Sequence, residues 1–129
     1  MVERQQLIRE AFHAYGEGDL APLKRLLAAD AKWIGIPGGA GEGGKAYACD
    51  DRSQIVGRLA QHHTNGRRFT LGEVIEQGDC VAVGFTINNP DWSGPVNAFK
   101  VFTFRQGENV VVQMNDCIDK SYALQVLAA

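Results

Sequence analysis

Residues 80–118 read CVAVGFTINNPDWSGPVNAFKVFTFRQGENVVVQMNDCI. Runs rich in β-branched and aromatic residues alternate here with short turns, which is typical of consecutive antiparallel strands. With one run just upstream, the predicted strands are Arg68–Glu76, Cys80–Asn88, Pro95–Arg105 and Asn109–Ile118. Tight hairpin connections are expected around Gly78 and Gly107, and a looser turn over residues 89–94. The stretch therefore predicts a four-stranded antiparallel meander.

Three helices are predicted before the meander. Apolar residues recur at three- and four-residue steps over residues 3–16, which indicates an amphipathic helix. A second helix is expected over residues 19–30, with Asp19 as its N-cap. A third should begin at Asp51, with Gln54 completing a start that resembles a capping box, and end at Asn65-Gly66.

The remaining segments complete an α+β arrangement. A short strand is expected over residues 32–36, a glycine-rich loop over 37–44, and a closing helix over 119–127. Helices grouped ahead of a run of strands favour an α+β fold with the helices on one sheet face. A length of 129 residues predicts a single domain, residues 1–129.

Composition narrows the classes of function. The chain is 45% hydrophobic and 22% charged, with a net charge of -2, which is typical of a globular domain without a basic footprint for nucleic acid. The first residues lack the basic start and apolar core of a signal peptide. Cys49, Cys80 and Cys117 show no metal-ligand spacing. We expect a cytoplasmic protein with free thiols, no cofactor, no metal, and no nucleic-acid or membrane partner.

Two charged residues stand where the strand pattern predicts apolar ones. Asp116 alternates with four apolar residues of its run: Val110, Val112, Met114 and Ile118. Lys100 alternates in the same way with Val96, Ala98, Phe102 and Phe104. A charge on a buried apolar face is costly unless it is paired. If the connecting turn centres on Gly107, Lys100 lies diagonally across from Asp116, within reach of a long side chain. The pair is either a tuned acid in a pocket or a structural ion pair.

Several other candidate site residues also have a purely structural interpretation. Tyr15 either reaches the pocket with its hydroxyl or ends a helix as an amphipathic residue. Trp33 is expected at the pocket mouth, and Trp92 as a lid or a surface anchor. One residue of His62-His63 either faces the pocket or stays solvated near a helix C-terminus. The segment 39–46 mimics a phosphate-binding loop but lacks its Ser or Thr, so an entrance loop is the better interpretation.

The pattern Gly18-Asp19-Leu20…Leu26-Leu27-Ala28-Ala29-Asp30-Ala31-Lys32-Trp33 resembles the opening of nuclear transport factor 2-like domains. That superfamily includes ketosteroid isomerase, limonene epoxide hydrolase and SnoaL-like polyketide cyclases. The resemblance implies a cone-shaped fold, in which a curved antiparallel sheet and three helices enclose a deep apolar pocket. It also implies that the outer sheet face often forms a homodimer.

The resemblance also allows the family's catalytic patterns to be compared. The three ketosteroid isomerase positions fall on Ala11, Gly35 and Lys100, and none keeps the required residue. Of the five epoxide hydrolase positions, only the aspartate at Asp116 survives; the others fall on Phe85, Ile87, Trp33 and Gly35. SnoaL-like cyclases use a single acid/base aspartate in a hydrophobic pocket, and this chain satisfies that looser pattern.

Together these observations predict a SnoaL-like domain that binds a small, largely apolar molecule. In the catalytic hypothesis Asp116 carries the proton for cyclase, isomerase, hydratase or lyase chemistry, and Lys100 tunes it. The expected ligand-binding residues are Tyr15, Trp33, Phe85, Ala98, Phe102, Met114 and Ile118. The alternative is a non-catalytic ligand-binding or dimerisation module. A cavity on the order of several hundred Å³ would favour a ligand site. A homodimer is expected through the strand face of Asn97, Phe99, Val101 and Thr103.

Overall fold

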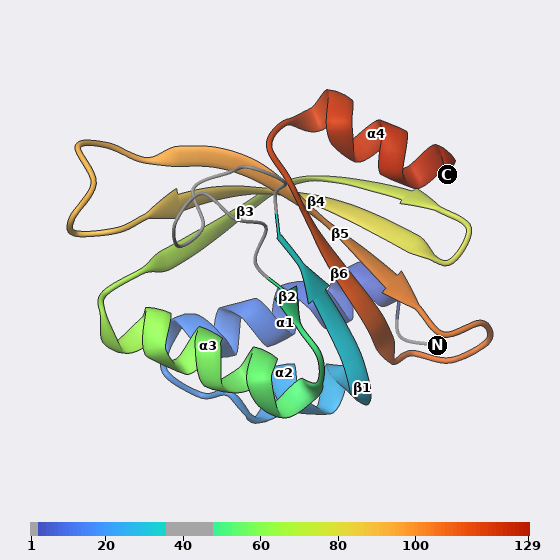
Figure 1. Ribbon diagram of the computed structural model, residues 1–129, viewed down its shortest axis with the longest axis horizontal. Helices are drawn as coiled ribbons and strands as arrows, with labels where there is room; N and C mark the ends of the chain where they lie inside the picture. The colour runs from blue at the N-terminus through green and yellow to red at the C-terminus, as the bar shows by residue number, and fades with distance from the viewer. Residues whose placement is uncertain (1–2, 36–47) are drawn as a thin grey trace.

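The computed structural model describes residues 3–35 and 48–129. Within these residues, four helices and six strands follow one another, and Figure 1 shows their arrangement. The helices are α1 (Arg4–Gly16), α2 (Ala21–Leu26), α3 (Arg52–Thr64) and α4 (Lys120–Ala128). The strands are β1 (Leu27–Ile34), β2 (Ala48–Cys49), β3 (Arg68–Gln77), β4 (Cys80–Asn88), β5 (Val96–Phe104) and β6 (Val111–Cys117). The α+β class predicted from the sequence is confirmed.

The predicted meander forms the larger part of one curved, six-stranded sheet with the order β2-β1-β6-β5-β4-β3 (Figure 1). Strands β3 to β6 pair antiparallel with their sequence neighbours, as expected. Strand β1 adds to β6 in the parallel direction, so the sheet is mixed. Gly78 and Gly107 have positive φ angles of 59° and 74° in the two hairpins, a conformation that glycine adopts without steric cost.

The second helix is shorter than the sequence predicts. It ends at Leu26, and residues 27–30, which we expected to be helical, begin strand β1. Leu27, Ala28 and Ala31 are buried in the core. Pairing with β6 and burial of these side chains override the helical preference of a Leu- and Ala-rich segment, because intrinsic propensities are weak compared with tertiary packing.

The third helix follows its predicted start closely. The side chain of Asp51 accepts a hydrogen bond of 2.9 Å from the backbone N–H of Gln54, as an N-cap should. The side chain of Gln54 in turn accepts from the backbone N–H of Asp50 at 2.8 Å. The helix ends before Gly66, whose φ of 92° turns the chain toward β3. A side chain at Gly66 would also collide with Pro90 at 2.7 Å, so this turn requires glycine.

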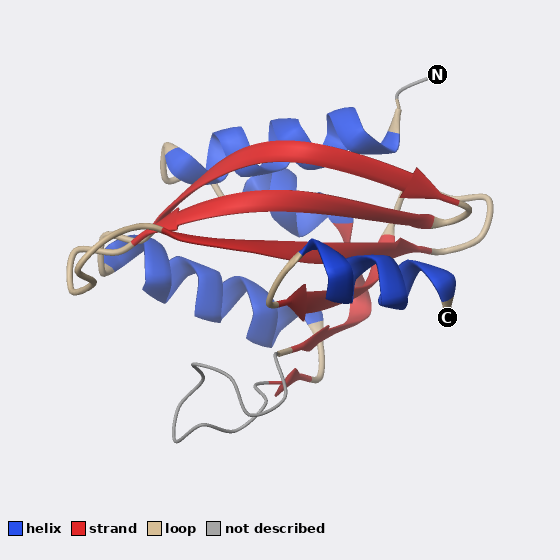
Figure 2. Ribbon diagram, turned by 90° about the horizontal axis from the view of Figure 1, so that it is seen from above, coloured by secondary structure: helices blue, strands red, loops and turns tan. Residues whose placement is uncertain are grey.

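The sheet separates two apolar layers. Helices α1, α2 and α3 contribute to the main core on the concave face, whereas α4 packs on the opposite face over β4 and β5 (Figure 1). Figure 2 looks onto the α4 face and shows that this helix covers part of it. Val101 is fully buried there, and Phe99 packs against the same cluster. The exposed patch from which we predicted a homodimer is therefore partly covered by the chain's own last helix.

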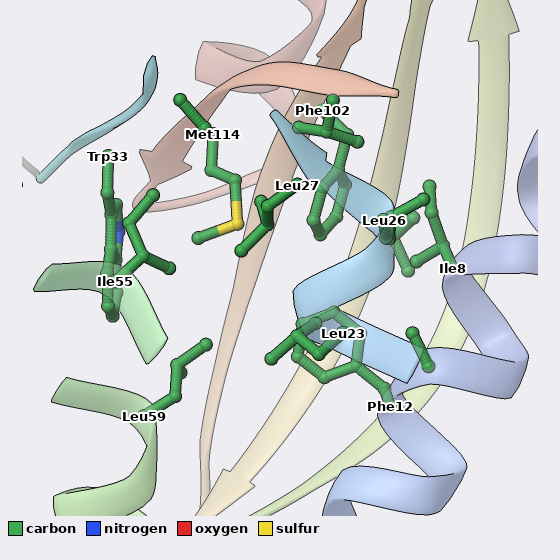
Figure 3. Packing of buried hydrophobic residues seen from close by; sticks show 14 of the residues in the cluster. Ile8, Phe12, Leu23, Leu26, Leu27, Trp33, Ile55, Leu59, Phe102 and Met114 are labelled. Atoms are coloured by element: carbon green, nitrogen blue, oxygen red, sulfur yellow. The ribbon is translucent and has the colours of Figure 1, made fainter. Parts of the chain in front are cut away.

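Most of the concave interior is filled by side chains. Figure 3 shows Phe12, Leu23, Phe102 and Met114 converging from helices and strands on the same volume. Phe12 alone makes edge contacts with four aromatic rings, those of Tyr15, Phe69, Phe85 and Phe102. Among the described helices, none combines the length and the hydropathy that a bilayer-spanning segment needs.

Candidate functional site

Lys100 and Asp116 lie directly opposite each other on β5 and β6. We expected a diagonal relationship. The hairpin closes with a hydrogen bond from the Arg105 N–H to the Val110 carbonyl, and a register shift follows between the pairs Phe104↔Val111 and Thr103↔Gln113. The turn geometry shifts the expected register by one residue and this irregularity by a second, so Asp116 rather than Met114 faces Lys100. Nζ of Lys100 donates to Oδ1 of Asp116 at 2.5 Å.

The two partners differ in their access to solvent. The Lys100 side chain is only 7% exposed, whereas the Asp116 side chain is 23% exposed. Nζ of Lys100 also lies 4.6 Å from the ring centre of Trp33 and 6.0 Å from that of Phe69. Aromatic faces attract a cation at such distances, and more strongly where water is excluded. The ammonium is thus held by one carboxylate and two rings, and the carboxylate is the more accessible partner.

The pair borders a small, partly open cavity of about 90 Å³. Its wall consists of Trp33, His62, Arg67, Phe69, Phe85, Ile87, Ala98, Phe99, Lys100 and Asp116. This volume has room for several water molecules or for a small chemical group. It is smaller than the several hundred Å³ expected above for a ligand site, because side chains such as Phe102 and Met114 fill the space beneath it.

A second pair of polar side chains lies on the same wall. Nη1 of Arg67 is 3.3 Å from Nδ1 of His62, and Nε of Arg67 donates to Oδ1 of Asn89 at 3.3 Å. Burial, followed by the nearby cations of Arg67, Arg58 and Lys100, lowers the pKa of His62 to about 4, whereas Asp116 opposes the shift. His62 is therefore a neutral imidazole at physiological pH, able to accept or donate a hydrogen bond.

Five of the sequence-predicted site residues meet at this cavity: Trp33, Phe85, Ala98, Lys100 and Asp116. Four others lie elsewhere. Tyr15 is buried with 1% exposure, and its hydroxyl donates to the Leu59 carbonyl at 2.6 Å. Phe102 and Met114 belong to the filled core and are not among the lining residues. The prediction that Ile118 forms a wall is wrong, because β6 ends at Cys117 and leaves Ile118 61% exposed.

The cavity also contains residues that the sequence analysis did not place there, namely Arg67, Phe69, Ile87 and Phe99. Two adjacent arginines, Arg67 and Arg68, stand where β3 begins, a position that is usually solvated. Arg68 is indeed exposed, but Arg67 is half-buried and contacts the face of Trp92 at 4.9 Å. The turn at Gly66 and the loop that carries Asn89 and Trp92 position Arg67, and no local sequence pattern reports that association.

The remaining candidates contribute little chemistry. Burial raises the pKa of the Cys117 thiol to about 11, and Cys49 is buried, so neither thiol is an accessible thiolate nucleophile. Within residues 3–35 and 48–129, no three His, Cys, Asp or Glu side chains gather as metal ligands would. The phosphate-loop mimic at 39–46 lies outside the described residues. The site thus offers one accessible carboxylate, one neutral imidazole and two cations beside aromatic walls.

The fold defines the class of protein. The chain aligns over its full length with an NTF2-like protein of unknown function from Burkholderia pseudomallei, at 22% identity, full coverage of both chains and a TM-score of 0.73. It also aligns with TerC co-crystallised with polyporic acid, at 23% identity, 98% coverage of both chains and a TM-score of 0.72. These similarities establish the nuclear transport factor 2-like fold.

The sequence then assigns the family. Residues 8–112 match the SnoaL-like domain, and this chain belongs to that family. Another structure with the same fold is that of IdmH from Streptomyces antibioticus, provisionally assigned as a polyketide cyclase, at 21% identity and a TM-score of 0.67. The alignment covers 99% of this chain and 100% of IdmH. A sequence comparison with curated proteins finds no match.

Proposed function

We propose that this chain binds a small, largely apolar molecule at the cavity of Lys100 and Asp116, and that Asp116 exchanges a proton with it. The observation that carries the proposal is the ion pair itself. Its carboxylate keeps 23% exposure on a wall formed mostly by Trp33, Phe85 and other apolar residues. A purely structural pair would gain more from complete packing, whereas an acid/base group must touch its substrate.

The chemistry follows from the two charges. A carboxylate beside a bound ketone can remove a proton from the carbon next to the carbonyl, and the carbonyl oxygen then becomes an enolate oxygen. The Lys100 ammonium has three N–H donors, only one of which is needed for Asp116, so another can stabilise that developing charge. Return of the proton to a different atom gives isomerisation, and attack of the enolate on a second carbonyl gives cyclisation. The provisional assignment of IdmH as a polyketide cyclase is consistent with this class.

The size of the cavity limits what it accepts. A volume of about 90 Å³ suits the reacting end of a molecule, with the remainder extending through the open side. The rings of Trp33, Phe69 and Phe85 favour a flat, unsaturated group over a bulky aliphatic one, because aromatic rings interact best in stacked or edge-on arrangements. We therefore expect small conjugated ketones or acids to bind better than sterols.

The second candidate is a non-catalytic module of the same fold. The filled core beneath the cavity and the direct cross-strand pairing of Lys100 with Asp116 favour it. A homodimer and a cytoplasmic location also stay predictions. The homodimer now depends on surface other than the α4-covered residues, such as the exposed Ile118 and Leu124. A monomer by light scattering at micromolar concentration would count against it.

A thermal-shift screen tests the proposal. The panel contains conjugated ketones, epoxides, polyketide-like acids and sterols, and it compares the wild type with Asp116→Asn. Glu73→Gln is the matched control, because it removes a carboxylate from an exposed ion pair with Lys120. A ligand at about 100 times its Kd stabilises the wild type by about 2.7 kcal/mol. We expect the shift to be lost or changed in Asp116→Asn and kept in Glu73→Gln. Silence across the panel, with a much less stable Asp116→Asn, would support the structural module.

A further inference from the structure

Arg67 is the one charged residue on the cavity wall, among those described, that has no charged partner. Its guanidinium is half-buried between the end of α3 and the start of β3. It lines the same cavity as Lys100 and Asp116. Lys100 satisfies its charge with the Asp116 carboxylate. Asp116 attracts Arg67 at longer range, but within the described part of the chain no carboxylate oxygen lies within ion-pair distance of Arg67.

The contacts of Arg67 are all with neutral groups. Nε donates to the side-chain oxygen of Asn89 at 3.3 Å, and Nη1 lies 3.3 Å from Nδ1 of His62. The Trp92 ring packs against one face of the guanidinium, 4.9 Å from its central carbon. Among residues 3–35 and 48–129, no acceptor forms a hydrogen bond with Nη2. One edge and one face of the Arg67 guanidinium are thus held in place, and the N–H groups of Nη2 remain available to a ligand.

This arrangement leaves an excess of positive charge at the cavity. The charges of Lys100 and Asp116 cancel as a pair, and His62 is neutral, so Arg67 adds one uncompensated charge. Charged groups removed from water are usually paired, because desolvation of an isolated ion costs several kcal/mol. A guanidinium that is fixed at one edge and one face has already lost much of its side-chain freedom, which favours binding of an external anion.

We infer that Arg67 binds the anionic group of the ligand, and that this group is a carboxylate attached to a flat, unsaturated body. A carboxylate matches the planar guanidinium, which can donate two parallel hydrogen bonds to it. The rings of Trp33, Phe69 and Phe85 then contact the unsaturated part. The inference rests on the function proposed above and specifies the substrate class of the same site.

The arrangement of charges orients such a ligand. Its carboxylate is attracted to Arg67 and repelled by the accessible carboxylate of Asp116. The reacting carbon, rather than the acid group, is thereby directed toward Asp116 and Lys100. Arg67 would act as a binding residue and Asp116 as the proton carrier, so the two roles are separable by mutation.

A pair of isosteric probes tests the inference. Benzoate and benzamide differ in charge but scarcely in shape, and both can be titrated into the ¹⁵N-labelled protein and followed by the indole N–H signals of Trp33 and Trp92. We expect benzoate to bind at least 10-fold more tightly than benzamide to the wild type. Arg67→Gln should abolish this preference. Arg25→Gln, which removes the same charge from an exposed position on α2, should keep it.

A second variant distinguishes loss of the guanidinium from loss of the fold. Arg67→Lys keeps the charge but not the planar fork, and it should retain a weakened preference for benzoate while melting near the wild type. Equal binding of the two probes to the wild type, a preference that survives Arg67→Gln, or no binding of benzoate at tens of millimolar would each overturn the inference. If neutral ketones still bind in a way that depends on Asp116, the proposed function stands and only the anionic class fails. If no probe or panel compound binds, both fail.

Discussion

Lys100 and Asp116 face each other across β5 and β6, with 2.5 Å between Nζ and Oδ1, at the point where the filled core gives way to a small cavity. The irregularity of β6 near Val112 aligns the two residues. Strand irregularities of this kind often lie beside functional sites, where they redirect a side chain. The pair therefore combines a precise backbone position with one partner that remains open to solvent.

The ion pair is expected to cost stability when only one partner is removed. Asp116→Asn leaves the Lys100 charge 7% exposed with a neutral partner, so the free energy of unfolding should fall by about 1–3 kcal/mol. The double variant Lys100→Met, Asp116→Leu should be within about 1 kcal/mol of the wild type or more stable, because apolar residues of similar size replace both charges. Urea unfolding of the three proteins measures both values.

Two results would contradict this description of the pair. A double variant much less stable than Asp116→Asn would mean that the charges themselves hold the fold together. No change in Asp116→Asn would mean that Lys100 finds another partner in solution.

His62 should make the folded state sensitive to acid. Its pKa is about 4 in the folded chain against an ordinary value of 6.5, so between these pH values the unfolded chain binds a proton that the folded chain does not. The stability contribution is complete above pH 6.5 and is lost as the pH falls through 4, by about 2 kcal/mol, because partial solvent exposure of the imidazole reduces the full value of about 3 kcal/mol. His62→Gln should show a shallower loss over this window. His13→Gln, which changes an exposed histidine, should follow the wild type. If the free energy of unfolding depends on pH in the same way in all three proteins, His62 is not the group responsible.

Tyr15 should behave as a structural residue. Tyr15→Phe removes the hydroxyl that donates to the Leu59 carbonyl, so stability should fall by about 1 kcal/mol without a change in ligand binding. Burial raises the Tyr15 pKa to about 12, so the unfolded chain loses this proton first and the wild type should lose stability as the pH rises from 10 through 12.

The alkaline loss should be smaller in Tyr15→Phe than in Tyr122→Phe, which changes a tyrosine on α4. Thermal melts between pH 8 and 11 provide the comparison. Weaker ligand binding by Tyr15→Phe at neutral pH would instead indicate that Tyr15 contributes to the ligand site.

Patterns that repeat along the chain could be predicted, and positions that depend on distant contacts could not. The alternation over residues 68–118 predicted β3 to β6, and the odd charges at Lys100 and Asp116 predicted their proximity. The end of α2 was missed because the segment after Leu26 has a helical composition, and only its parallel pairing with β6 makes it a strand. The register of Asp116 relative to Lys100 was missed because the turn and an irregularity in β6 each shift it by one residue, and no local pattern marks either shift.

Side-chain roles were harder to predict than elements. Arg67 was not predicted at the site because its partners, Asn89 and Trp92, come from a loop more than twenty residues later. Phe102 and Met114 share the alternation of the cavity face, but they lie deeper along the strands, where the interior is filled. Alternation identifies which face a residue occupies, and it does not report how far the opposite helices fill the space.

The most direct test of the central claim is to map ligand binding on the folded protein. Trp33 lines the cavity and Trp92 packs on Arg67, and the chain has only these two tryptophans, so their indole N–H signals report on the site. With the strongest ligand from the screen, we predict that both indole signals move in the wild type, that amide signals of α4 stay in place, and that Asp116→Asn binds at least 10-fold more weakly. Unchanged indole signals, with shifts confined to α4 or the outer sheet face, would contradict a ligand site at Lys100 and Asp116.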